Sequence, residues 1–279
     1  MKIVKRISEW KSILQSLQGK KIGFVPTMGY LHQGHLSLFL KAKEESDIVV
    51  GSIFVNPLQF GPTEDFSTYP RNLERDAQML EEIEVDYLFV PTVEEMYPQS
   101  IQTTVSVKGI TEVLCGASRP GHFDGVATVV LKLFQIIQPD FAYFGLKDAQ
   151  QVAVIEQMVR DLNVPVTLRP CPIVREHDGL AMSSRNVYLS ETERSKATIL
   201  YKSLEWAKNQ INQGCKKNDE LERGIIEIIQ QVPEANIDYV EIRQYPTLVK
   251  EEQLQGKVLI ALAVRFGKTR LIDNVLIEI

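Results

Sequence analysis

The sequence predicts an α/β protein in which a Rossmann-like domain with a parallel sheet is followed by a smaller α+β domain. Short apolar runs alternate with stretches of helical spacing between residues 21 and 169, which is typical of βαβ units. After residue 185 the pattern changes to two amphipathic stretches and then three strand-like runs. A chain of 279 residues, 44% of them hydrophobic, is long enough for one large domain or two smaller ones. We expect a boundary near Ile173, with the Rossmann-like domain at 1–173 and the smaller α+β domain at 174–279.

The elements of the first domain follow from apolar runs and helical periodicity. The expected strands are residues 22–25, 48–55, 87–90, 141–144 and 166–168. The expected helices are residues 36–45, 72–82, 125–137 and 148–162. The third helix is the most apolar, so we expect it to pack against the sheet.

The second domain is expected to contain helices 191–212 and 219–232, then strands 237–243, 258–266 and 270–277. Gly267 and Lys268 join the last two strands, and the glycine can supply the positive φ of a tight hairpin turn. The same residues resemble the end of a P-loop, but Leu262 stands where the first glycine should be. No GxGxxG motif supports a dinucleotide site.

The composition favours a protein that binds small molecules rather than nucleic acid or membrane. The formal net charge of −5 gives no general attraction to nucleic acid or to an anionic membrane. Cys115, Cys171 and Cys215 are odd in number and contain no CxxC, so neither a disulfide framework nor a zinc site is indicated. The N-terminus lacks the features of a secretion signal and no segment is apolar enough to span a bilayer, so we expect a cytoplasmic protein.

The most informative motif is residues 24–35, Phe-Val-Pro-Thr-Met-Gly-Tyr-Leu-His-Gln-Gly-His, which lies between the first apolar strand and its helix. A strand-to-helix turn offers backbone N–H groups and the positive end of the helix dipole to a phosphate. Gly34 allows close approach, and His32 and His35 can donate hydrogen bonds to charge developing on phosphate oxygens. The alternatives are helix-capping histidines or a metal site, although no third ligand stands nearby.

The HxGH element resembles that of the nucleotidyltransferase superfamily, and four further blocks narrow the resemblance. They are residues 54–61 (FVNPLQFG), 119–126 (RPGHFDGV), 145–151 (GLKDAQQ) and 175–186 (REHDGLAMSSRN). In this order and with the first motif, they resemble the pantothenate synthetase (pantoate–β-alanine ligase) family. The resemblance spans nearly the whole chain. Leu146 and Ala149 depart from the residues that many members carry there.

Several of these residues also have an interpretation of their own. Asn56 and Gln59 follow a strand at the carboxyl edge of the sheet, where open α/β sheets bind ligands, and loop capping is their alternative. Lys147 can meet phosphate at the same edge; a surface lysine followed by an Asp148 N-cap is the alternative. A solvated connector that ends where a helix begins is the alternative for Ser183 and Ser184, and applies less to Arg185.

The resemblance implies a set of ligands and roles. It implies ATP with Mg²⁺, pantoate and β-alanine as ligands, no metal held by the protein alone, and a homodimer. Catalysis is assigned by resemblance to His35, His32, Lys147, Ser183, Ser184 and Arg185. ATP binding is assigned to Met28, Gly29, His32, Gly34, His35, Gly145, Leu146, Lys147, Asp148, Val174, Met182, Ser183, Ser184 and Arg185. Binding of pantoate and β-alanine is assigned to Asn56, Gln59 and Gln151.

The implied reaction is ATP-dependent condensation of pantoate with β-alanine through an acyl-adenylate. Two alternatives remain open. The first is another nucleotidyltransferase that moves AMP or CMP to a phosphorylated metabolite. The second is a nucleotide sensor without turnover, which would have no need for groups aimed at a transition state.

Overall fold

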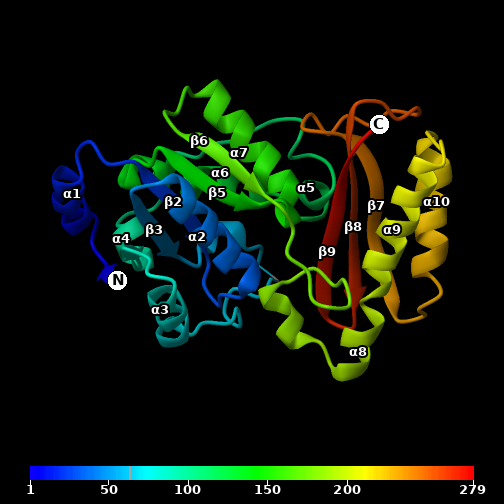
Figure 1. The fold of residues 1–279 in the computed structure, drawn as a ribbon, viewed down its shortest axis with the longest axis horizontal. Helices are drawn as coiled ribbons and strands as arrows, with labels where there is room; N and C mark the ends of the chain where they lie inside the picture. The colour runs from blue at the N-terminus through cyan, green and yellow to red at the C-terminus, as the bar shows by residue number, and fades with distance from the viewer. Residues whose placement is uncertain (63) are drawn as a thin grey trace. The chain divides into compact units, whose positions relative to one another are not determined.

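The computed structural model describes residues 1–62 and 64–279 (Figure 1). The chain divides into two compact units, one made of residues 1–108 and 119–172 and the other of residues 109–118 and 173–279. The expected ranges, 1–173 and 174–279, assigned residues 109–118 to the first domain. In the structure this segment belongs to the second unit, where the Cys115 Sγ atom lies 3.2 Å from the Tyr239 hydroxyl.

The first unit is built on a six-stranded parallel sheet in the order β1-β4-β3-β2-β5-β6. This confirms the predicted fold class. The strands are β1 (Lys2–Val4), β2 (Ile22–Thr27), β3 (Ile48–Ile53), β4 (Tyr87–Phe89), β5 (Phe141–Gly145) and β6 (Thr167–Cys171). Because β2 pairs with β3 on one side and β5 on the other, the strand order reverses there, and ligands bind at such switch points in open α/β sheets.

Helices cover the sheet and bury its apolar side chains. Phe39 of α2 and Leu80 of α3 belong to one core cluster, whereas Phe134 of α6 packs edge-on against Phe24 and Phe144. The helices of this unit are α1 (Ile7–Ser16), α2 (Gln33–Glu45), α3 (Leu73–Glu82), α4 (Val93–Met96), α6 (His122–Ile137) and α7 (Ala149–Asp161), with 3-10 turns η1 (Pro57–Gln59) and η2 (Leu146–Asp148).

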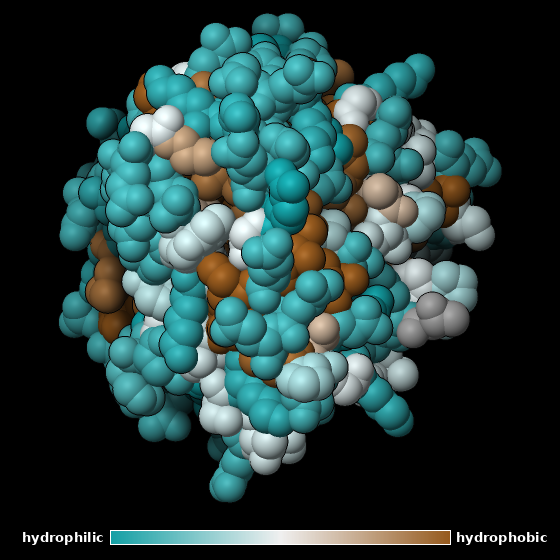
Figure 2. Space-filling view, turned by 90° about the vertical axis from the view of Figure 1, so that its right-hand side faces the viewer, coloured by the Kyte–Doolittle hydropathy of each residue, from teal (hydrophilic) through white to brown (hydrophobic). Residues whose placement is uncertain are grey.

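The second unit packs helices against an antiparallel sheet in the order β7-β8-β9. Its elements are α5 (Cys115–Ser118), η3 (Ser184–Tyr188), α8 (Glu191–Lys196), α9 (Ile199–Asn212), α10 (Asn218–Ile229), β7 (Ala235–Gln244), β8 (Lys257–Phe266) and β9 (Thr269–Glu278). Phe266 pairs with Thr269 and Gly267 has a φ of 56°, so the predicted tight turn is confirmed. Figure 2 shows a mostly hydrophilic face with hydrophobic residues gathered near its centre.

The single helix predicted at 191–212 is wrong, because α8 ends at Lys196 and α9 begins at Ile199. The Ser195 hydroxyl donates to the Thr192 carbonyl at 2.9 Å, and the Thr198 hydroxyl donates to the Ser195 carbonyl at 2.8 Å. Such local hydroxyl bonds compete with the helical ladder and favour a bend or break. In the described ranges, 1–62 and 64–279, no helix has both the length and the apolar character needed to cross a membrane.

Candidate active site

The loop after β2 is held in place by one buried carboxylate. Asp76 on α3 is 1% exposed and accepts from the backbone N–H groups of Tyr30 and Leu31 at 2.6 and 2.8 Å. Tyr30 needs this support because its φ of 52° is unusual for a residue with a side chain. Burial raises the pKa of Asp76, while the two backbone hydrogen bonds oppose that rise. These contacts fix the backbone of the loop that leads into helix α2.

Helix α2 begins at the two histidines, and its backbone determines which ring nitrogen of each carries the proton. The Gly34 N–H donates to Nδ1 of His32 at 3.1 Å, and the His32 N–H donates to Nδ1 of His35 at 3.3 Å. A nitrogen that accepts from an N–H cannot itself carry a proton in the neutral ring. In the neutral state the proton therefore lies on Nε2 of both rings, whose centroids are 4.0 Å apart.

Both histidines are held neutral. Burial, followed by the charge of Lys147, lowers the pKa of His32 to about 4. The pKa of His35 is lowered well below its usual range by burial and then by His32 and Lys147. Each ring therefore offers an Nε2–H donor at neutral pH without adding a charge.

The residues after β5 bring a cation to the same edge of the sheet. Lys147 lies in η2 directly after β5, and β5 pairs with β2, the strand that leads to the two histidines. The charge of Lys147 contributes to the lowered pKa of both rings. Its Nζ atom is 3.4 Å from the Asp148 carboxylate. A Cβ atom on Gly145 would meet nothing within 4 Å, so the backbone there borders open space. Neutral donors, one cation and a helix N-terminus form an arrangement suited to a polyphosphate.

The side chains of Asn56 and Gln59, which follow β3, contact each other. Asn56 is fully buried, and its Nδ2 donates to Oε1 of Gln59 at 3.1 Å. Gln151 lies in the first turn of α7 and is partly buried. The expected acid-binding residues therefore come from the ends of β3 and β5, on either side of β2.

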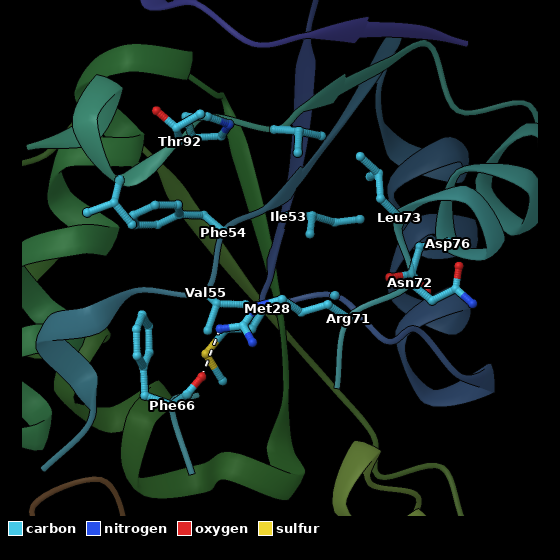
Figure 3. Close-up of a pocket in the computed structure, with 14 residues that line it drawn as sticks. Met28, Ile53, Phe54, Val55, Phe66, Arg71, Asn72, Leu73, Asp76 and Thr92 are labelled. Atoms are coloured by element: carbon cyan, nitrogen blue, oxygen red, sulfur yellow. Dashed lines mark hydrogen bonds between the residues drawn. The ribbon is translucent and has the colours of Figure 1, made fainter. Parts of the chain in front are cut away.

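A cavity of about 270 Å³ opens beside the loop after β2 (Figure 3). Met28 and Gly29 line it, together with apolar side chains such as Phe54 and Phe66 and the cation Arg71. The Arg71 guanidinium donates to the Phe66 carbonyl at 2.8 Å. Of the expected site residues, only Met28 and Gly29 line this cavity; the histidines and Gln59 do not.

The remaining expected residues belong to the second unit. The backbone of Arg175 forms an antiparallel β-bridge with that of Ala181, and the Met182 N–H donates to the Val174 carbonyl at 3.0 Å. These contacts make a hairpin-like loop. Ser183 precedes η3 and accepts from the Arg185 N–H at 3.3 Å. Bidentate bonds of 2.7 and 2.9 Å from Arg175 to Asp273 fasten the loop to β9. The roles of Ser183, Ser184 and Arg185 at a nucleotide stay predictions.

Sequence reasoning missed the residues that support the site. Asp76 and Tyr97 carry no motif, because their partners lie far away in the chain. Arg119 and His122 stand within a quoted block but received no chemical role, and both contact the backbone of Gln59. Across residues 1–62 and 64–279, no three His, Cys, Asp or Glu side chains gather as a metal site.

Comparisons with known proteins give one consistent result. The sequence profile of pantoate-beta-alanine ligase matches residues 2–276. The pantothenate synthetase of Caldicellulosiruptor bescii is 59% identical over 280 residues, covering 100% of this chain and 99% of that protein. A crystal structure of pantothenate synthetase from Thermus thermophilus is similar with a TM-score of 0.94 at 49% identity, covering 99% of both chains.

A second structure is that of a pantoate-beta-alanine ligase from Francisella tularensis, complexed with beta-gamma ATP and beta-alanine. It is similar with a TM-score of 0.81 at 40% identity, covering 99% of this chain and 97% of that one. Each similarity extends over both units. The chain therefore belongs to the pantoate-beta-alanine ligase family.

Proposed function

We propose that this carbon–nitrogen ligase forms pantothenate in two steps. First, a carboxylate oxygen of pantoate attacks the α-phosphorus of ATP, the bond to the bridging oxygen breaks and pyrophosphate leaves. Pantoyl-adenylate then stays bound. In the second step the β-alanine amine attacks the activated carbonyl, the amide forms, AMP leaves, and the nitrogen gives up a proton to solvent. No covalent bond to the enzyme is needed.

The observation that carries this proposal is the pair of neutral Nε2–H donors beside Lys147. Donors fixed in advance stabilise charge that develops on pyrophosphate oxygens as the bond breaks, with no reorganisation at that moment. Lys147 supplies the one full positive charge among these three groups. A neutral donor also avoids repelling the lysine. We assign His35 the role of main donor to the leaving phosphate, with His32 beside it.

The other roles rest on the resemblance together with the local geometry. Gln59 and Gln151 hold pantoate, and Gln59 also faces β-alanine. Met182 to Arg185 close over the nucleotide as part of a lid that keeps water from the mixed anhydride. Met28, Gly29, Gly34, Gly145, Leu146, Asp148 and Val174 complete the nucleotide site. The Francisella tularensis relative was solved in complex with beta-gamma ATP and beta-alanine, which supports ATP and β-alanine as substrates here.

We further propose that Mg²⁺ arrives with ATP. The groups at the switch point are two neutral imidazoles and a lysine, which suit phosphate oxygens better than a divalent cation. The metal would therefore be held mainly by the triphosphate, whose charge it neutralises. A homodimer and a cytoplasmic location stay predictions from the sequence and the resemblance.

The test is to measure AMP, pyrophosphate and pantothenate formed from ATP, Mg²⁺ and pantoate, with and without β-alanine. Steady AMP release that requires both pantoate and β-alanine, with amide formed in equal amount, is the expected result. AMP or CMP transfer that ignores β-alanine would identify another nucleotidyltransferase. Binding of ATP with no product would identify a sensor.

A further inference from the structure

The side chain of Asn56 is locked by backbone groups whose donor or acceptor character is unambiguous. Its Nδ2 donates to the Gly125 carbonyl at 3.1 Å, and its Oδ1 accepts from the Leu58 N–H at 3.4 Å. Tyr97 adds a hydroxyl that donates to the same Oδ1 at 2.9 Å. A carbonyl can only accept and an N–H can only donate, so the amide of Asn56 has one possible orientation.

The orientation of Gln59 follows from that of Asn56. The second N–H of Asn56 Nδ2 points at the Gln59 side chain, so the atom that receives it must be Oε1, 3.1 Å away. Gln59 therefore directs its oxygen inward, and Nε2 is the atom that can face a substrate. Asn56 is fully buried, and its two N–H groups both point at protein acceptors. Its part in the site is to orient Gln59 rather than to contact the acid.

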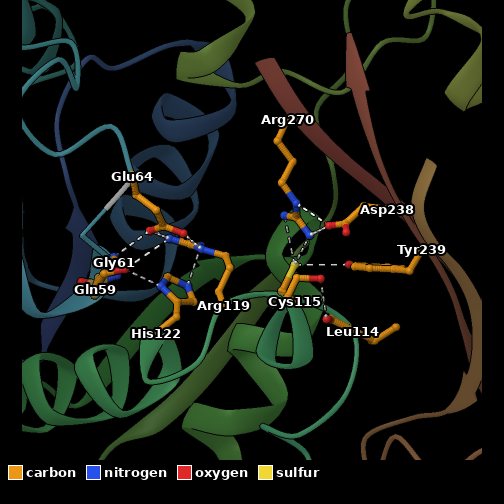
Figure 4. Close-up of polar contacts among 11 residues, drawn as sticks. Gln59, Gly61, Glu64, Leu114, Cys115, Arg119, His122, Asp238, Tyr239 and Arg270 are labelled. Carbon is orange, nitrogen blue, oxygen red and sulfur yellow. Dashed lines mark hydrogen bonds and ion pairs between the residues drawn. The ribbon is translucent and has the colours of Figure 1, made fainter. Parts of the chain in front are cut away.

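A second set of contacts holds the backbone of Gln59 (Figure 4). Arg119 is donor-only, so Nε2 of His122, 3.0 Å from its guanidinium, must accept, and the proton of the neutral ring lies on Nδ1. That Nδ1–H donates to the Gln59 carbonyl at 2.8 Å, and Arg119 donates to the same carbonyl at 3.2 Å. Glu64 holds the guanidinium through contacts of 2.6 and 2.7 Å.

The environment keeps this arrangement in one protonation state. Burial, followed by the charge of Arg119, lowers the pKa of His122 to about 4. A neutral His122 can accept from Arg119 and donate to Gln59 at the same time; a protonated ring loses the acceptor.

We propose that Tyr97, Asn56, His122 and Arg119 are positioning residues that present Gln59 as a hydrogen-bond donor, so that the site selects an acid with an oxygen acceptor at that point. The inference rests on the proposed role of Gln59 in binding pantoate. A neutral amide suits this position because its Nε2–H group can donate to a hydroxyl or carboxylate oxygen of a substrate acid. Loss of the support changes the fit of the acid and leaves the nucleotide site intact.

Two pairs of variants test the proposal in the full-length enzyme. Tyr97→Phe removes only the donor to Asn56, and Tyr143→Phe is its control, because Tyr143 is a buried tyrosine of the same unit that donates to Glu45. His122→Asn keeps a donor near the Nδ1 position, whereas His122→Gln puts its amide near the Nε2 position. We expect Tyr97→Phe and His122→Gln to raise the KM for pantoate up to about tenfold, the usual size of one hydrogen bond, with the KM for ATP within about twofold. His122→Asn should be milder than His122→Gln.

A double variant with Gln59→Ala shows whether the supporting residues act on pantoate binding through Gln59 or by weakening the structure in general. If the supporting residues act through Gln59, Tyr97→Phe should add little to the pantoate KM once Gln59→Ala is present. Thermal melts of every variant identify any that has unfolded, and Tyr97→Phe keeps the test valid if His122→Gln does not fold. An unchanged pantoate KM in Tyr97→Phe, or a full additional effect in the Gln59→Ala background, overturns the inference. A wild-type pantoate KM in Gln59→Ala instead overturns the proposed role of Gln59.

Discussion

At the scale of single residues, the hydrogen bonds around each histidine of the site determine which ring nitrogen carries the proton. His32 and His35 each receive a backbone N–H on Nδ1, so the helix that they begin also selects their tautomer. The same logic, with Arg119 as the donor, gives His122 the opposite tautomer. In the neutral rings of His32 and His35 the proton therefore lies on Nε2, whereas in His122 it lies on Nδ1 and is donated to the Gln59 carbonyl.

Replacing His35 tests the outward donors. We expect His35→Ala to reduce the rate of adenylate formation by about 10²- to 10³-fold, the usual cost of one charge-stabilising donor. His35→Gln should recover part of the rate, because its amide nitrogen approximates Nε2. Single-turnover formation of pantoyl-adenylate measures the effect, and circular dichroism checks the fold. A wild-type rate in His35→Ala would remove His35 from the mechanism.

The lowered histidine pKa values also make stability depend on pH. The pKa of His32 and that of His122 are about 4 in the folded chain against an ordinary value of 6.5. Between these values the unfolded chain binds more protons, so the free energy of unfolding falls as the pH falls through this window. We expect the urea midpoint to be lower at pH 5 than at pH 7. The drop should be smaller in His32→Asn, and an equal drop in the two proteins would contradict the assignment.

Sequence reasoning identified the candidate site residues but not the residues that contact them. His32, His35 and Lys147 stand at strand ends within short motifs, so their meeting at one sheet edge follows from topology. Asp76 lies on a helix more than forty residues after the loop that it contacts, and the sequence around Asp76 contains no motif that predicts the contact. Tautomers likewise depend on hydrogen bonds that a sequence does not display. His122, whose chemistry the sequence left unassigned, is explained only by its neighbours.

At the scale of elements, helix α6 and turn η1 are packed as one piece. Gly125 is the point of contact: a Cβ there would lie 2.1 Å from the Leu58 carbonyl oxygen and 2.9 Å from the Gln59 nitrogen. Both are backbone atoms, so neither can swing aside as a side chain would. The close approach allows the Gly125 carbonyl to reach Asn56.

We therefore expect Gly125→Ala to force α6 and η1 apart. The free energy of unfolding should fall by about 1–3 kcal/mol, the usual cost of overpacking, and the pantoate KM should rise. Gly61→Ala is the control, because its Cβ would meet only the Glu64 side chain at 3.7 Å or more. Urea denaturation and steady-state kinetics measure the two effects. Equal stability of the two variants would argue against a rigid α6–η1 contact.

Elements with strong periodicity were predicted well, and the exceptions have physical causes. The core strands and helices of the first unit appear where apolar runs and helical spacing indicated them, with bounds shifted by a few residues. Strand β1 was not predicted, since three residues, Lys2–Val4, give no pattern. The break between α8 and α9 was missed because the hydroxyls of Ser195 and Thr198 act locally, whereas periodicity continues across them.

At the scale of the whole molecule, the second unit is not continuous in sequence. Residues 109–118 reach it from within the first unit's part of the chain. Their anchor is Cys115, whose sulfur lies 3.2 Å from the Tyr239 hydroxyl and 3.5 Å from the Arg270 guanidinium (Figure 4). Arg270 in turn donates to Asp238 at 2.8 Å. The composition of residues 109–118 is ordinary, so the sequence does not predict that this segment belongs to the second unit.

Removing the central cation of this anchor should weaken the second unit. Arg270→Ala leaves the partly buried Asp238 carboxylate without its ion pair, so we expect the free energy of unfolding to fall by about 2–4 kcal/mol. Arg223→Ala is the control, since its pair with Asp219 is exposed and should change stability by at most about 0.5 kcal/mol. Chemical denaturation compares them, and similar losses would show that the anchor contributes little.

The discontinuous second unit also limits how this protein can be recombined with its relatives. The chain passes between the units three times, after residues 108, 118 and 172. A chimera with one crossover at 172 would combine one parent's Cys115 with the other parent's Tyr239 and Arg270. Exchange of the whole unit requires two inserted segments, 109–118 and 173–279, taken from the same donor. Shuffled libraries cut only at the later boundary should therefore lose folded members whenever the parents differ at these contacts.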